Sequence, residues 1–183
     1  ELFDKLYSLD PLPGLEDECE SRGVEIIREP IRNAGAVTAF QQLESQFSPL
    51  ELVKSASDML DVGGMFFMTT RTISGFDLQT LWDKTPYIFV PEHLNLLSIE
   101  GIRRLLESGG LNTMELSTPG QLDVELVIHA AKNDPTIALP RFISELCNER
   151  DRLAHQDFQE YLQKHRLSSH VRVAALRREG VST

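Results

Sequence analysis

The sequence predicts an α/β fold with a mostly parallel sheet, and two observations carry this prediction. Short apolar runs alternate with helical patterns over the first two-thirds of the 183 residues, which is typical of successive strand–helix–strand units. The run Met65–Thr70 (MFFMTT) is continuously apolar, as expected of a central strand that is buried on both faces. The length favours one domain with room for an elaboration.

Composition and charge narrow the classes of partner. Hydrophobic residues make up 41% and charged residues 25% of the chain, and no apolar stretch approaches the ~18 residues that span a bilayer. Acidic residues outnumber Lys and Arg by 28 to 18, giving a net charge of −10. Proteins that bind a nucleic-acid backbone do so through clustered Lys and Arg side chains. We therefore expect small-molecule or protein partners and neither nucleic acid nor membrane.

The two cysteines and the N-terminal residues indicate a reducing cytoplasm. Cys19 and Cys147 form no CxxC pattern and have no neighbouring histidine, so neither a zinc site nor a disulfide framework is expected. The first residues lack the basic-then-apolar layout of a signal peptide.

The N-terminal half is expected to contain three short strands and two helices. The strands are Lys5–Asp10, Val24–Arg28 and Ala36–Phe40, and an acidic helix at Leu15–Arg22 separates the first two. A second helix begins after Ser48, since Ser48 is a good N-cap, Pro49 suits the first helical position and Glu51 completes a capping box. Asp61–Gly64 is expected to end this helix before the apolar strand.

The C-terminal half is expected to be mainly helical. Residues 71–97 are aromatic-rich without a period, and the stretch Gly75–Pro91 is predicted to be a mobile lid. Ser98 caps the next helix, which ends at two glycines. The remaining elements are a strand at Asn112–Ser117, helices at Gln121–Lys132 and Arg141–His165, and a strand at Val171–Leu176. The two long helices are predicted to lie over or beside the sheet edge as a substrate lid or a homodimer contact.

Several segments, taken in order, resemble the class I S-adenosylmethionine-dependent methyltransferases. The segments are LDPLPGLEDECESRGVEII, AVTAFQQLESQFSP, LVKSASDMLDVGGMFFMTTR and HLNLLSIEGIRRLLESGGL. The last is similar to the subgroup of small-molecule and ubiquinone-type methylases. The resemblance implies a Rossmann-like core over residues 1–118, a helical insertion over 119–167, and a last core strand, antiparallel, in 168–183.

The sequence departs from this family at its most diagnostic element. The glycine-rich loop DxGxGxG, whose glycines allow close backbone approach to the cofactor, occurs nowhere in the 183 residues. Ser45 stands where many relatives carry a histidine. From the resemblance we expect a sheet that is incomplete at the N-terminus, and weak binding of S-adenosylmethionine, or none, by these residues alone.

The resemblance implies cofactor-binding residues at two strand ends. Asp10 would accept hydrogen bonds from the ribose hydroxyls of S-adenosylmethionine, although Asp-Pro is also ordinary turn chemistry. Ala39, Phe40 and Gln41 would flank the methionyl part of the cofactor. For Phe40 the favoured interpretation is a core residue, whereas for Gln41 cofactor binding and an ordinary structural role are equally favoured.

Residues that follow the central strand are candidates for substrate binding. Thr70 and Arg71 lie where ligands bind in open α/β sheets, although strand-end capping explains them equally well. His93 is the candidate catalytic base because its ordinary pKa lies near neutrality; the alternative is a histidine that holds its loop through a carbonyl. Asn95 is expected to bind substrate or to satisfy backbone groups of the same loop.

The predicted function is S-adenosylmethionine-dependent methyl transfer to a small molecule, with a sugar or nucleotide-linked sugar as acceptor. The alternative is a non-catalytic, degenerate Rossmann-like interaction module, which the absent glycine loop favours. A hydrolase is excluded because Ser168, Ser169 and His170 lack a recognisable nucleophile elbow. Neither an HxxxH nor an HExxH spacing occurs in the sequence, so no metal site is expected.

Overall fold

The computed structural model describes residues 3–90 and 92–178. In chain order the elements are β1 (Leu6–Leu9), α1 (Glu16–Ser21), β2 (Val24–Ile27), β3 (Ala34–Phe40), η1 (Leu43–Ser45), α2 (Pro49–Met59), β4 (Leu60–Arg71), α3 (Phe76–Leu81), η2 (Trp82–Lys84), α4 (Ile99–Ser108), β5 (Leu111–Ser117), α5 (Asp123–Asn133), α6 (Arg141–Glu149), α7 (Arg152–Lys164) and β6 (His170–Arg177). No helix among these is long and apolar enough to cross a membrane.

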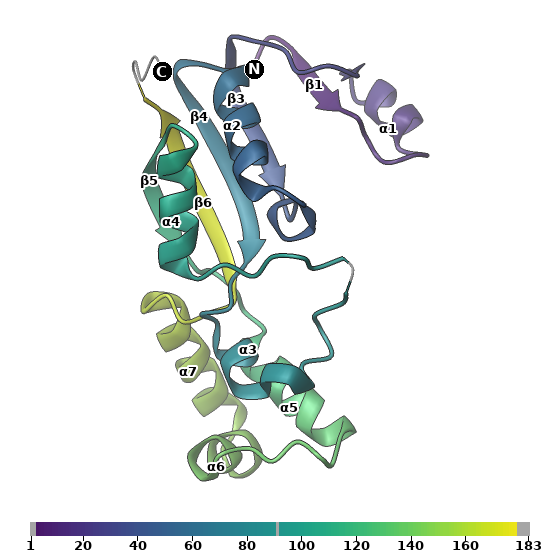
Figure 1. The fold of residues 1–183 in the computed structure, drawn as a ribbon. Coiled ribbons are helices and arrows are strands. Elements are labelled where there is room, and N and C mark those ends of the chain that lie inside the picture. Colours follow the sequence, from purple (N-terminus) through teal and green to yellow (C-terminus); the bar gives the residue numbers. More distant parts are fainter. Residues whose placement is uncertain (1–2, 91, 179–183) are drawn as a thin grey trace.

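The strands form two separate sheets (Figure 1). β1 and β2 pair in parallel, and the larger sheet has the order β3-β4-β6-β5. β3, β4 and β5 run in one direction, and β6 runs antiparallel to both of its neighbours. The predicted α/β class and the antiparallel last strand are therefore confirmed.

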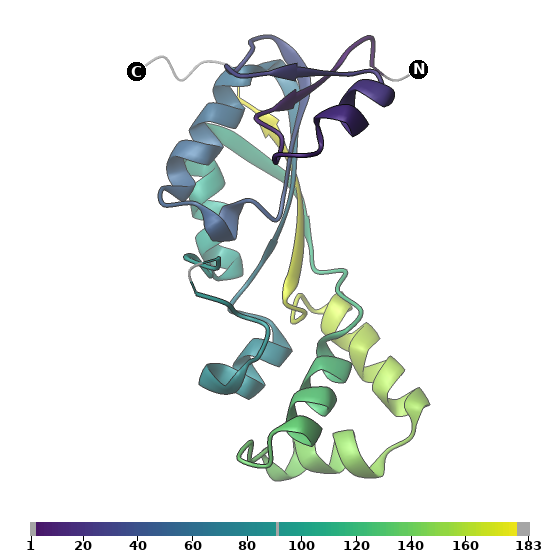
Figure 2. The same cartoon turned by 90° about the vertical axis from the view of Figure 1, so that its right-hand side faces the viewer.

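Helices α2 and α4 cover one face of the larger sheet (Figure 2). Phe66 and Met68 of β4 point toward these helices and are almost fully buried with Val53 of α2 and Ile102 of α4. Phe67, between them on the opposite face, remains 38% exposed. The expectation that β4 is buried on both faces is therefore wrong, because helices cover its opposite face too little to enclose this side chain.

Helices α3, α5, α6 and α7 gather beyond one end of the larger sheet (Figure 1). α3 packs on α5, and α5 contacts both α6 and α7. A second apolar core forms there around Leu81, Val127, Ala130 and Cys147. The helical group thus combines the three helices between β5 and β6 with α3, which belongs to an earlier part of the chain.

The structure corrects three expected boundaries. α3 lies within the segment predicted to be irregular, where Leu78 and Leu81 are buried at 2% exposure. The helix expected at Arg141–His165 is two helices, because Asp151 starts a new one by accepting a hydrogen bond from the amide of Ala154 (2.9 Å). α2 ends at Met59, and the glycines expected to end it lie inside β4.

Two sequence signals for helix starts had different outcomes. The hydroxyl of Ser98 accepts a hydrogen bond from the amide of Gly101 (3.0 Å), so the predicted cap of α4 is confirmed. Ser48 precedes α2 but makes no side-chain capping bond. Pro49 still occupies the first turn of α2, where its missing N–H costs nothing.

Candidate functional site

The carboxyl ends of β3, β4 and β5 meet at one edge of the larger sheet, where β6 begins. Polar side chains collect at this edge: Gln41 after β3, Arg71 at the end of β4 and His170 at the start of β6. Arg71 and His170 are register partners on neighbouring strands. Ligands of open α/β sheets bind beyond such an edge, so these residues define the candidate site.

Two of the predicted cofactor residues have an uncommon backbone conformation. Asp10 follows β1 with φ 44°, and Gln41 follows β3 with φ 51°. The amide of Gln41 donates to the carbonyl of Thr69 (2.8 Å), and that of Asp10 donates to Ile27 (3.1 Å). A non-glycine residue in the left-handed region costs about 1–3 kcal/mol and occurs preferentially where a site requires it. Asn33, Trp82 and Arg166 also have a positive φ, but among these described residues only Asp10 and Gln41 directly follow a strand of a parallel pair.

The structure places Asp10 apart from the end of β3. β1 pairs only with β2 among the described strands, in the separate two-stranded sheet. The Oδ1 atom of Asp10 lies 3.1 Å from Nη1 of Arg28, and both side chains are more than 60% exposed. Asp10 therefore keeps a solvent-facing carboxylate at a strand end, but no described strand pairing joins it to Gln41.

The residues that end β3 point to opposite faces of the sheet. Ala39 packs against the core beneath α2, whereas Phe40 is 58% exposed. The interpretation of Phe40 as a core residue is wrong, because alternation along β3 turns its ring to the face that helices do not cover. Gln41 is exposed as well, so the end of β3 presents an aromatic ring and an amide to solvent.

Glu44 joins three segments of the site, and the site prediction missed it. Glu44 is only 5% exposed, in η1 just after β3. The hydroxyl of Thr70 donates to its Oε2 (2.8 Å), and its backbone carbonyl accepts from the amides of Leu94 (2.7 Å) and Asn95 (3.0 Å). Thr70 is 1% exposed, so it fastens β4 to η1 and does not face an open surface.

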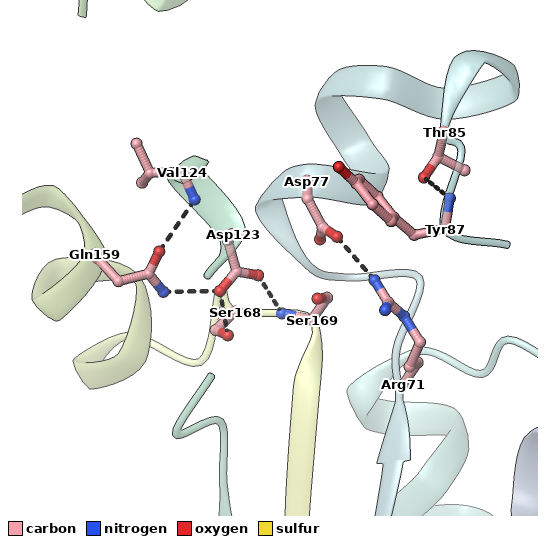
Figure 3. A network of polar contacts seen from close by, with 9 residues as sticks. All are labelled: Arg71, Asp77, Thr85, Tyr87, Asp123, Val124, Gln159, Ser168 and Ser169. Atoms are coloured by element: carbon pink, nitrogen blue, oxygen red, sulfur yellow. Dashed lines mark hydrogen bonds and ion pairs between the residues drawn. The ribbon is translucent and has the colours of Figure 1, made fainter. Parts of the chain in front are cut away.

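Arg71 is held by a fully buried carboxylate on α3 (Figure 3). Its Nη2 atom lies 2.8 Å from Oδ2 of Asp77, which is 0% exposed. Burial raises the pKa of Asp77; the charge of Arg71 opposes this shift, and that of Asp123 adds to it. The Nε atom of Arg71 is buried with no partner among the described residues, so the guanidinium retains unused donor capacity.

Asp123 at the start of α5 anchors the helical group to the sheet (Figure 3). Its carboxylate accepts hydrogen bonds from the Ser168 hydroxyl (2.6 Å), the Ser169 amide (2.7 Å) and the Gln159 side chain (2.7 Å). The side-chain oxygen of Gln159 (Oε1) in turn accepts a hydrogen bond from the backbone amide of Val124 (3.1 Å). Ser168 and Ser169 therefore serve a buried structural network.

The histidines near the edge differ in their surroundings. Burial lowers the pKa of His170, and the neighbouring charge of Arg71 lowers it further, while Glu44 and Asp123 act in the opposite direction. The Nδ1 atom of His93 lies 3.2 Å from the amide nitrogen of Phe89. His93 is thus turned toward its own loop, where it stabilises a backbone turn.

Asn95 contacts the backbone near η1, and the described residues form no metal-binding cluster. The side-chain amide of Asn95 donates to the carbonyl of Gln46, so it satisfies backbone beside η1. Within residues 3–90 and 92–178, no cluster of three or more His, Cys, Asp or Glu could hold a metal ion.

No protein-family model matches the sequence, and a search of curated proteins found no match. Solved structures do match. An S-adenosylmethionine-dependent methyltransferase from Mesorhizobium loti has a TM-score of 0.57 and 12% identity, over 94% of this chain and 80% of that protein. A methyltransferase from Thermotoga maritima has a TM-score of 0.56 and 11% identity, over 94% and 73%.

A third structure has bound ligands. A geranyl diphosphate C-methyltransferase from Streptomyces coelicolor, in complex with Mg²⁺, geranyl diphosphate and S-adenosyl-L-homocysteine, has a TM-score of 0.50 and 14% identity, over 89% of this chain. The present chain spans 57% of that protein. The chain thus has the Rossmann-like fold of class I S-adenosylmethionine-dependent methyltransferases.

Proposed function

We propose that this chain takes part in S-adenosylmethionine-dependent methyl transfer to a small-molecule acceptor, at the carboxyl edge of β3 and β4. The observation that carries the proposal is the pair of strained, non-glycine residues Asp10 and Gln41, each directly after a parallel strand. The fold of the solved neighbours supports it.

The exposed end of β3 fits one side of such a cofactor. The Phe40 ring offers an apolar surface, Gln41 offers an amide that donates and accepts, and Ala39 leaves room beside them because its side chain is small. Asp10 has an exposed carboxylate that can accept from ribose hydroxyls if β1 approaches this edge. When bound, the cofactor supplies an electrophilic methyl group on a positively charged sulfur.

The chain's own residues would align the acceptor with little acid–base work. Proximity supplies much of the rate in a displacement whose leaving group already carries positive charge. Arg71, held in place by Asp77, would bind an acceptor oxygen through its unused N–H groups. Thr70 would act indirectly by holding the Glu44 side chain, and Asn95 by holding the backbone of Gln46, so both would keep η1 in place beside the acceptor.

His93 is the proposed base for an acceptor that must lose a proton. Its Nδ1 is engaged by the Phe89 backbone, so the opposite ring nitrogen, Nε2, would take the proton. We propose a sugar or a nucleotide-linked sugar as the acceptor, in a reducing cytoplasm. The unpaired state of Cys19 and Cys147 fits that compartment.

A homodimer is a further part of the proposal. The exposed side chains of Phe142 on α6 (68%) and Leu153 on α7 (63%) give the helical group an apolar outer surface. Light scattering measures the solution mass directly. The mass of one chain at all concentrations would remove the dimer from the proposal and leave the helices as a lid.

A second candidate function is a non-catalytic interaction module. The absence of DxGxGxG from the 183 residues favours it, and so does the engagement of Asp10 by Arg28. Such a module would keep the fold and the helical group but bind no cofactor.

Ultraviolet cross-linking of methyl-labelled S-adenosylmethionine distinguishes the two candidates. The proposal expects label on the peptide that contains Phe40–Glu44, and expects excess S-adenosylhomocysteine to remove it. Labelling that is spread over unrelated peptides and resists competition would support the interaction module.

A further inference from the structure

An open hollow of about 750 Å³ lies between α7 and the face of the larger sheet on which Arg172 lies. It begins at the end of β5, on the same edge as the candidate cofactor strand. Its polar lining includes Ser117 and Arg172 from the sheet and Asp157, Glu160, Tyr161 and Lys164 from α7, beside Thr118, Gln163 and His165.

The spacing along α7 explains why these side chains share one wall. Asp157, Tyr161 and Lys164 follow one another at intervals of four and three residues, so they lie on one face of the helix. Among the described residues, neither Asp157, Glu160 nor Lys164 lies within 4.0 Å of an opposite charge. These three exposed side chains thus line the hollow without a charged partner among the described residues.

The two other polar contributors are already oriented. The guanidinium of Arg172 is held by Glu115 (3.1 Å), and its remaining donors are free. The Tyr161 ring lies against His165, with ring centres 4.4 Å apart, yet the residue stays 50% exposed. Tyr161 therefore offers the hollow a hydroxyl and an exposed part of its ring.

The balance of charge in the hollow selects the kind of ligand. Two carboxylates (Asp157, Glu160) and two cations (Lys164 and the Glu115-paired Arg172) line the hollow, so a polyphosphate would meet the carboxylates and a polyamine would meet the cations. A neutral group with several hydroxyls can donate to the carboxylates and accept from the cations at the same time. We infer that this hollow binds a polyhydroxylated, sugar-like group.

The register of the sheet fixes how far this group lies from the end of β3. Phe40 is opposite Thr69, Thr69 is opposite Arg172, and Arg172 is opposite Ser117. Three strand spacings at ~4.8 Å each give about 14 Å from Phe40 to Ser117. On the proposed function, which this step assumes, the acceptor is an elongated molecule whose sugar-like end occupies the hollow while its methylated group reaches β3.

Amide chemical shifts of the full chain test the hollow without any cofactor. The probes are methyl α-D-glucopyranoside, inorganic phosphate and putrescine at equal millimolar concentrations. We expect the sugar to shift the amides of Asp157–Lys164 and Ser117, and the other two probes to leave them in place. A larger response to phosphate or putrescine, or no response to any probe, would overturn the inference.

Two isosteric variants, Asp157→Asn and Tyr161→Phe, identify the groups involved. Each is expected to weaken the sugar response by about fivefold, the equivalent of one hydrogen bond. Glu125→Gln is the matched control, since Glu125 is exposed on α5 outside the hollow. Unchanged affinity in both variants would refute the assigned contacts. The result is independent of cofactor binding at β3, so the failure of one proposal is distinguishable from that of the other.

Discussion

At the scale of single residues, Thr70 has a buried hydroxyl with a buried carboxylate as its partner. Its Oγ1 donates to Glu44 (2.8 Å), and the two residues are 1% and 5% exposed. Thr70→Val keeps the shape but leaves the Glu44 carboxylate without this donor, so the free energy of unfolding should fall by about 1–3 kcal/mol. Urea denaturation measures the loss, and Thr70→Ser, which retains the hydroxyl, should recover most of it. Equal stability of the Ser and Val variants would contradict the role of this bond.

Asp77 should make stability depend on pH. Burial raises its pKa above 3.8 in the folded chain. Between 3.8 and the raised value, the folded chain holds a proton that the unfolded chain has released, so stability falls as the pH rises through this window. Asp77→Asn removes the titrating carboxyl group. The free energy of unfolding of the variant should therefore rise relative to that of the wild type as the pH rises from about 4, by at most ~1.4 kcal/mol per pH unit.

Denaturation of both proteins from pH 4 to pH 7 measures this difference. Asp83→Asn, at an exposed position in η2, is the control for removing a carboxylate near α3. Parallel stability curves for wild type and Asp77→Asn would show that Asp77 does not titrate in the window.

The sequence locates site residues at strand ends better than their buried partners. Gln41 and Arg71 are predictable because they directly follow strands that the apolar runs reveal. Asp77 and Asp123 are not predictable in this way. An acidic residue is normally solvated, and only the contacts of the folded chain show that these two are buried. Asp123 and Ser168 lie 45 positions apart, and no local pattern relates them.

At the scale of elements, Gly75 sets how closely the start of α3 approaches the start of β6. A Cβ atom at this position would lie 2.2–2.5 Å from atoms of Ser169, including its backbone. Gly75→Ala should therefore destabilise the protein by about 1–3 kcal/mol through overpacking. Thermal unfolding measures the effect. Gly35→Ala is the matched control, because nothing lies within 4 Å of its Cβ position, and its stability should stay close to wild type.

The segment predicted to be a lid should divide into two parts. Leu78 and Leu81 of α3 are buried, Leu81 in a cluster with Val127 of α5, whereas Trp82 and Phe89 are 63% and 55% exposed. Amide hydrogen exchange should show protection within Phe76–Leu81 and fast exchange over residues 83–90. Protection over 83–90 as strong as that of Met65–Thr70 would contradict the lid interpretation.

The difference between predicted and observed elements has a physical cause. Strands and the start of α4 follow from local signals, namely apolar runs and the Ser98 cap. α3 has only six residues, too few to show a helical period, and it owes its stability to packing on α5. The division between α6 and α7 depends on a single capping aspartate, Asp151, which an amphipathic pattern conceals.

At the scale of the whole molecule, one edge of the sheet organises both proposed sites. The end of β3 presents Phe40 and Gln41, and the hollow beside α7 lies across the same sheet. Asp123 holds the helical group on this edge through bonds to Ser169, which directly precedes β6, and to Gln159 of α7. The arrangement predicts that the cofactor and the sugar-like group bind at separate places, each detectable alone.

The central claim is that the end of β3 binds the nucleoside cofactor, and amide chemical shifts during titration with S-adenosylhomocysteine test it most directly. Without the glycine loop, the loss of several hydrogen bonds at about 1 kcal/mol each should move the dissociation constant from micromolar into the millimolar range. We predict progressive shifts at Ala39–Glu44 with little change at Asp157–Lys164. No shift at Ala39–Glu44 at millimolar ligand, or shifts confined to the hollow beside α7, would contradict the account.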